Sequence, residues 1–170
     1  MKIVSRLLVL SFALAAAGCA SSYAWKPRVP AAMRTVSVPS FRNETQLVEI
    51  GAISTRQVAR EFQREGTFRL ASADDAALEI QGVVKSVKDG AVAYNRRTLS
   101  RHVACDLKLT AVVSVVDKRE GKVLVDNKTY VAQTSTVVGQ DQTTAERDAS
   151  GRLADDLARQ VVDDVLNLKW

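Results

Sequence analysis

Cys19 is the residue whose chemistry the sequence specifies most clearly. Lys2 and Arg6 give the chain a basic start, and an apolar run over residues 7–17 follows. Such a run suits a secretory signal, whose apolar part has about 7–15 residues, whereas a membrane-spanning helix needs about 20. Small residues stand directly before Cys19, so the segment resembles the lipobox cut by signal peptidase II, with Ala16 at the usual leucine position. The alternative is an ordinary signal peptide with a chance cysteine.

The lipobox predicts a covalent lipid as the one group attached to the chain. We expect residues 1–18 to be removed and Cys19 to become the first residue, with a diacylglycerol on its thiol and an N-acyl chain such as palmitate. Ala20 and Ser21 follow without an aspartate, which favours the outer membrane under the common sorting rule for bacterial lipoproteins. Cys105 is then left without a disulfide partner, and we expect it to act as a small hydrophobic residue.

A basic cluster is the second feature that could do chemistry. Five cations bracket a segment that we expect to connect two long strands, and Tyr94 lies among them. Arginine and lysine side chains exposed at a hairpin tip can bind phosphate oxygens, and the arginine fork does so bidentately. The alternative is that the charges protect a sheet edge against pairing. The cluster consists of Lys85, Lys88, Arg96, Arg97 and Arg101.

The sequence offers little from which to build a catalytic or metal site. His102 is the one histidine, and Asp106 follows it on the same side of an expected strand, but there is no G-x-S-x-G elbow to supply a nucleophile. The paired aspartates are neighbours in sequence, so their side chains do not converge. No P-loop, dinucleotide fingerprint or zinc spacing occurs. We expect no enzyme activity, no metal and no cofactor beyond the lipid on Cys19. The aspartate pairs are Asp74 with Asp75, Asp155 with Asp156, and Asp163 with Asp164.

The charge balance of the chain is mildly basic. It has 24 Lys and Arg against 19 Asp and Glu, and two of the cations leave with the predicted signal. A nucleic-acid-binding domain is usually far more basic, so no nucleic-acid partner is expected. The small excess is compatible with lipid head groups or a phosphorylated glycolipid.

The elements that position these residues form a single domain over residues 34–170, after a tether over residues 19–33. Period-two alternation predicts strands, and 3.6-residue spacing predicts two amphipathic helices. The simplest arrangement is an α+β two-layer sandwich, with both helices on one face of a mixed, largely antiparallel sheet of four to five strands. The expected strands are 35–41, 76–88, 103–115 and 122–133, with a short one at 68–71, and the helices are 45–65 and 143–168.

Four segments resemble the lipopolysaccharide-assembly lipoprotein family, LptE. Residues 36–45 (VSVPSFRNET) resemble its VPxFxNxT opening, and residues 60–66 followed by Arg69 and Leu70 resemble the end of its first helix. Residues 73–82 (ADDAALEIQG) resemble its ADAxLxG strand entry, and residues 153–162 its closing helix. The likeness covers nearly the whole mature chain.

This resemblance implies an outer-membrane lipoprotein that acts as the plug and assembly partner of an LptD-like β-barrel and binds lipopolysaccharide, its domain facing the periplasm or the barrel lumen. Family residues that contact the glycolipid coincide with Asn95, Arg96 and Arg97 here. A second family position, in the loop before the last helix, has no Lys or Arg in residues 138–142. The cations available to substitute are Lys85, Lys88 and Arg101.

A second class of function stays open at this point. Small lipoproteins that regulate an envelope enzyme or a secretion complex, of the penicillin-binding-protein-activator or curli-secretion type, also begin with a strand that ends in a similar VxxF-N-T turn. Such a protein would bind a synthase or a secretion partner, and its depletion would leave surface lipopolysaccharide unaltered.

Overall fold

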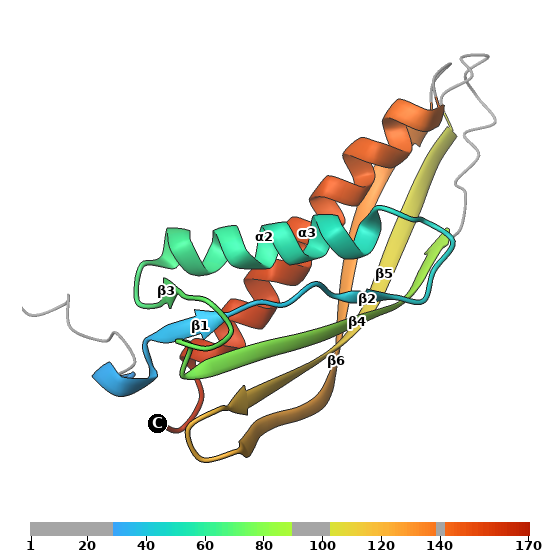
Figure 1. Cartoon of the computed structure of the whole chain (residues 1–170). Helices are drawn as coiled ribbons and strands as arrows, with labels where there is room; N and C mark the ends of the chain where they lie inside the picture. Colours follow the sequence, from blue (N-terminus) through green and yellow to red (C-terminus); the bar gives the residue numbers. More distant parts are fainter. Residues whose placement is uncertain (1–28, 90–102, 139–141) are drawn as a thin grey trace, which may run out of the picture.

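The computed structural model describes residues 29–89, 103–138 and 142–170 (Figure 1). Three long strands carry the sheet, three very short strands extend it, and two helices accompany it. The elements, in chain order, are η2 (Ala31–Met33), β1 (Thr35–Ser37), β2 (Arg42–Asn43), α2 (Ile50–Glu65), β3 (Arg69–Leu70), β4 (Leu78–Asp89), β5 (Val103–Asp117), β6 (Lys122–Val138) and α3 (Gln142–Leu166).

The sheet is mixed, with strand order β3-β1-β4-β5-β6 and β2 also paired to β4. The short strands β1, β2 and β3 pair in parallel, while β4, β5 and β6 form an antiparallel meander. Alternate residues of β5 from Leu107 to Val115 are buried, and the residues between them are exposed or half-buried. Both helices therefore cover one face of the sheet (Figure 1), which confirms the predicted α+β two-layer sandwich.

The sheet has six strands, so the expected count of four to five was wrong. The strand expected over residues 35–41 forms only over Thr35–Ser37, before Pro39, which has no N–H to donate to a ladder, and β2 at Arg42–Asn43 was not expected. β1 pairs with Leu78 and Glu79 at the start of β4, and β2 pairs with Val83 and Val84 further along the same strand. The short strand expected at residues 68–71 is confirmed as β3.

The first helix begins at Ile50, five residues later than predicted, because a polar turn holds the chain before it. The Asn43 side-chain amide donates to the carbonyl of Leu47 at 2.7 Å, and its oxygen accepts from the backbone N–H and the hydroxyl of Thr45. Local bonds of this kind compete with helix formation. At the other end, Gly66 adopts φ 82° and donates to the Phe62 carbonyl, as the predicted C-cap.

Phe41 packs between the sheet and the first helix and approaches one glycine on each side. Its ring lies on the bare backbone of Gly82 in β4, where a Cβ would come within 2.5 Å of the ring atoms Cδ2 and Cζ. Its carbonyl oxygen would lie 2.9 Å from a Cβ on Gly51 in α2. The Thr55 hydroxyl accepts a hydrogen bond from the Phe41 N–H at 2.9 Å and donates to the Gly51 carbonyl at 2.8 Å. Phe41 is thus held on both sides by positions that tolerate no side chain.

The core lies between the covered sheet face and the two helices. The predicted inner face of α3 is confirmed, since Leu153, Leu157, Val161 and Val165 are all buried. Val29, which falls within the segment expected to be a tether, is 1% exposed, and Arg34 Nε donates to its carbonyl at 3.1 Å. The end of that segment therefore packs against the domain.

A row of α3 side chains at four-residue spacing reaches the outer edge of β6. Arg152 Nε donates to the Thr134 hydroxyl at 3.1 Å, and Gln160 Nε2 donates to the Val131 carbonyl at 3.1 Å. An Asp156 oxygen accepts from the Gln133 N–H at 3.3 Å, and Asp164 pairs with Lys128. Unpaired backbone groups on an edge strand can pair with a strand of another molecule. The α3 side chains of this row bind some of these groups on β6.

Gly82→Ala tests the contact with Phe41. We expect it to lower the free energy of unfolding by about 1–3 kcal/mol, because the new methyl overlaps the Phe41 ring. Urea unfolding monitored by circular dichroism measures the change. Gly151→Ala in α3 is the matched control, since its Cβ meets nothing within 4 Å, and we expect it to stabilise the protein by about 0.5–1 kcal/mol.

A double-mutant cycle with Phe41→Ala completes this test. If the ring causes the overlap, Gly82→Ala costs less in the Phe41→Ala background than in the wild type. Equal costs in the two backgrounds would contradict the packing described.

Asp156→Ala with Gln160→Ala tests the edge row. Loss of both side chains exposes the Gln133 N–H and the Val131 carbonyl, so we expect self-association that rises with protein concentration, measured by size-exclusion chromatography with light scattering. Asp155→Ala with Arg159→Ala, which alters exposed residues of the same helix, serves as the control. An unchanged mass distribution in the edge variant would show that β6 is protected by other means.

Candidate functional site

Lys88 and Lys108 stand directly opposite each other on the uncovered face of the sheet. Lys88 of β4 is in register with Lys108 of β5, and both side chains are exposed. Lys108 alternates with the buried residues Leu107 and Leu109, which places the pair on the face away from the helices. Opposed residues of antiparallel strands have Cβ atoms about 4.5–5.5 Å apart, and like charges there are destabilising. Neither lysine forms an ion pair within the part of the chain that the structure describes, so an anion bound between them would relieve the repulsion.

The predicted candidate Lys85 lies close to this pair but is already partnered. Its Nζ is 2.9 Å from Glu44 Oε2, and Arg42 Nη2 is 2.8 Å from Glu44 Oε1. The hydrogen bond from Lys85 is the main cause of a lowered pKa at Glu44, so this carboxylate stays ionised at neutral pH. The charge of Lys85 is therefore compensated by Glu44, whereas Lys88 and Lys108 have no ion-pair partner within the described residues.

The other predicted candidates lie outside the described residues: Cys19, Arg96, Arg97 and Arg101, together with His102. They stay predictions. Their place in the chain is still informative, because β4 ends at Asp89 and β5 begins at Val103. The segment that carries the arginines therefore follows β4 directly after the lysine pair, whereas β5 begins five residues before Lys108.

Sequence reasoning missed Lys108. The alternation of residues 103–115 placed it on the polar face, but only the register of β4 against β5 brings it opposite Lys88. A β-bulge between Val84 and Ser86 shifts this register, with Lys85 as the extra residue. Counting along the ladder from Leu78 and Asp117 at its other end therefore would not have aligned the two lysines.

An apolar strip runs along the same uncovered face. Its four valines are half-buried, and polar residues lie between them on this face of the sheet. Val83 is in register with Val112, and Val116 and Val131 continue the strip on β5 and β6. An apolar strip that ends in two lysines complements a ligand that is both apolar and anionic.

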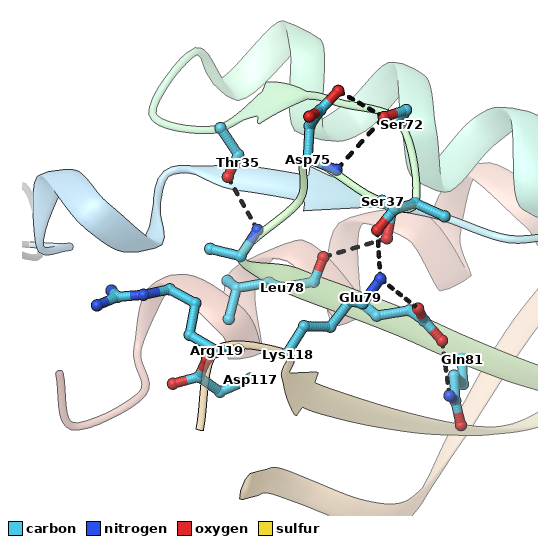
Figure 2. Close-up of polar contacts among 12 residues, drawn as sticks. Thr35, Ser37, Ser72, Asp75, Leu78, Glu79, Gln81, Asp117, Lys118 and Arg119 are labelled. Atoms are coloured by element: carbon cyan, nitrogen blue, oxygen red, sulfur yellow. Dashed lines mark hydrogen bonds and ion pairs between the residues drawn. The ribbon is translucent and has the colours of Figure 1, made fainter. Parts of the chain in front are cut away.

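Several acidic residues form local hydrogen bonds that stabilise loops and turns. At the opposite end of β4, the Ser72 hydroxyl donates to Asp75 Oδ2 at 2.7 Å within a loop (Figure 2). In the β5–β6 turn, Asp117 Oδ1 accepts from the N–H of Arg119 at 2.9 Å. Within residues 29–89, 103–138 and 142–170, no group of three or more His, Cys, Asp or Glu side chains could hold a metal ion. None of the helices described there has the length and apolar character to cross a membrane.

Comparison with known families gives one match. The family model described as lipopolysaccharide-assembly, LptE, matches residues 33–165. The match therefore includes every strand of the sheet and nearly all of α3. No curated protein sequence matches the chain.

Several solved structures share the fold. A hypothetical protein from Chlamydia trachomatis has a TM-score of 0.53 at 13% identity and covers 79% of this chain and 96% of that one. A protein from Xanthomonas campestris has a TM-score of 0.51 at 11% identity, with 84% and 88% covered. A neuraminyllactose-binding hemagglutinin homologue from Helicobacter pylori has a TM-score of 0.50 at 13% identity, with 81% and 85% covered. At these identities the likeness shows the fold alone.

Lys85→Met tests the electrostatics beside the site. Glu44 has a lowered pKa in the folded protein, so its ion pair stabilises the fold above the ordinary carboxyl pKa and is lost as the pH falls through the lowered value. In Lys85→Met we expect the Glu44 pKa to rise toward its usual range, measured by a carbon-13 NMR titration of the carboxyl. Lys88→Met is the control. A rise of equal size in the control would show that the whole cationic end, and not Lys85, sets the value.

Proposed function

We propose, because the chain belongs to the LptE lipopolysaccharide-assembly family, that it is an outer-membrane lipoprotein that binds lipopolysaccharide and serves as plug and assembly partner of an LptD-like β-barrel. Its role is to bind and position, and catalysis has no part in it. The observation that carries the proposal is the pair Lys88 and Lys108 at the end of an uncovered, partly apolar sheet face.

The lysine pair supports binding of a phosphorylated glycolipid on electrostatic grounds. Two like charges held opposite each other favour a ligand that brings negative charge between them. Hydrogen bonds between charged partners are about twice as strong as neutral ones, so a phosphate bridging both ammonium groups would gain appreciably. Arg96, Arg97 and Arg101 belong to the segment that starts beside this pair, and they would add bidentate contacts.

The uncovered face also supports the barrel partnership. Six strands expose one face with the half-buried valines Val83, Val112, Val116 and Val131, and no described element of the chain covers it. Apolar side chains gathered on an uncovered sheet face are compatible with a partner surface. We propose that the wall of the barrel and the glycolipid meet this face, while acyl chains on Cys19 hold the domain at the membrane.

Lys88→Gln with Lys108→Gln tests the glycolipid site. We expect the affinity for lipopolysaccharide to fall by about tenfold or more, because each lost charged contact is worth about 1.5–3 kcal/mol. Binding of the full-length protein in detergent to radiolabelled lipopolysaccharide measures this. The matched control, Lys122→Gln with Lys169→Gln, removes the same charge from exposed positions outside the site, and its affinity should change far less.

Arg96→Ala with Arg97→Ala extends this test to the predicted arginines. If they contact the glycolipid, their loss weakens binding further in the lysine variant. Unchanged affinity in both double variants, with the melting temperature retained, would refute the site.

A further inference from the structure

A cleft of about 670 Å³ opens on the helix side of the sheet, at the end where Lys88 lies. Its volume falls within the range of about 300–1,000 Å³ that is usual for sites of small organic ligands. The walls come from the turn before α2, from the end of β4, from β5 and from α3. The cleft is separate from the lysine pair, which lies on the opposite face of the sheet.

The cleft has an apolar part and a polar part. Leu47, Val87, Leu107 and Leu153 supply the apolar part, and Leu153 is 1% exposed. The polar part consists of Glu44, Thr45, Gln46, Lys85, Ser86 and Ser150. A smaller cavity of about 160 Å³ shares Leu47 with the cleft and continues along the start of α2, where Ile53 lines the wall. The apolar side chains of the two hollows together form a groove that could hold a flexible hydrocarbon chain, with polar groups beside it.

Cationic side chains stand where the groove opens. Arg147 and Glu49 line the smaller cavity, and Arg147 forms no ion pair within the described part of the chain. Lys85 lines the rim of the larger cleft, held by Glu44. An apolar groove with cations at its mouth complements a hydrocarbon chain that is attached to an anionic head group.

The edge of β4 beside the groove is unpaired beyond Val84 within the described residues, because β2 pairs with Val83 and Val84 and ends there. Lys88 lies only three residues further along β4 than Lys85. A ligand could therefore rest its head group near Lys88 and pass one chain around this edge into the groove.

We infer that the groove lined by Leu47, Val87, Leu107 and Leu153 binds one acyl chain of an anionic glycolipid. This inference rests on the proposed function and adds to it a second contact for the same ligand. The lysine pair binds phosphate, and the groove binds hydrocarbon. The glycolipid is then recognised by both its charge and its apolar part, whereas a free phosphosugar would use the lysine pair alone.

Variants that fill the groove test this inference. Leu47→Trp and Val87→Trp each place a larger side chain in the groove from a half-buried position, so the fold should survive. We expect the affinity of the full-length protein in detergent for hexaacyl lipid A to fall about tenfold, because buried methylenes are lost from the complex. The matched control is Gln63→Trp, at an exposed residue near the end of α2 that lines neither hollow, and its affinity should not change.

A second probe is the disaccharide bisphosphate of lipid A without its acyl chains. Its binding distinguishes a failure of the groove inference from a failure of the proposed function. Its binding should be unaffected by Leu47→Trp and Val87→Trp but weakened by Lys88→Gln with Lys108→Gln. If the lysine variant loses lipid A and both tryptophan variants retain it, the groove inference is wrong and the proposed function stands. If the lysine variant binds both probes like the wild type, the proposed function fails instead.

Competition with a phospholipid tests whether the acyl chain in the groove belongs to a glycolipid or to a phospholipid. Palmitoyl-oleoyl phosphatidylglycerol should displace lipid A only weakly, because its phosphodiester carries one negative charge, whereas a phosphate monoester of lipid A brings about −1.5 to −2 between the two lysines. Displacement at equal concentration would assign the groove to phospholipid chains and would overturn the inference as stated.

Discussion

The packing of Phe41 on the backbone of Gly82 is the contact on which the rest of the structure depends. It presses the segment after Pro39 against β4, while Gly51 allows α2 to approach the other side of the same residue. The Thr55 hydroxyl then bonds to both Phe41 and Gly51. One aromatic residue thereby places the first helix on the sheet, just before β2, whose pairing ends at Val84. Close packing of this kind leaves no room for even one added methyl group.

The proposed function depends on the part of β4 that lies beyond its contact with Phe41. Beyond Val84 the edge of β4 is unpaired within the described residues, and the β-bulge at Lys85 turns the strand toward Glu44. The same strand thus supplies the rim of an apolar groove on one face and Lys88 on the other. On the far side of the sheet, the α3 row directed at β6 occupies part of the opposite edge. The two edges therefore differ. The edge of β4 beside the site is open, and the edge of β6 is partly covered by side chains of α3.

Much of this fold could be predicted from the sequence, because the long strands alternate strictly and the helices have clear apolar faces. The α+β class and the buried residues of α3 followed from these periods. The strand count was wrong because β2, only two residues long, lies beyond the expected first strand and shows no alternation of its own. The late start of α2 depends on Asn43, whose bonds are local but not periodic. Lys108 could not be singled out, since a bulge sets its register, while Cys19 and the arginines stay predictions.

The central claim is that the uncovered sheet face meets lipopolysaccharide and an outer-membrane barrel. A photo-crosslinking amino acid at Thr129, an exposed residue in register with Val112 on that face, tests it in intact envelopes. The account predicts adducts with lipopolysaccharide and with one large β-barrel protein, and far fewer from Asp155 on the exposed side of α3. Adducts from Thr129 with an envelope enzyme or a secretion protein, and none with lipopolysaccharide, would contradict it.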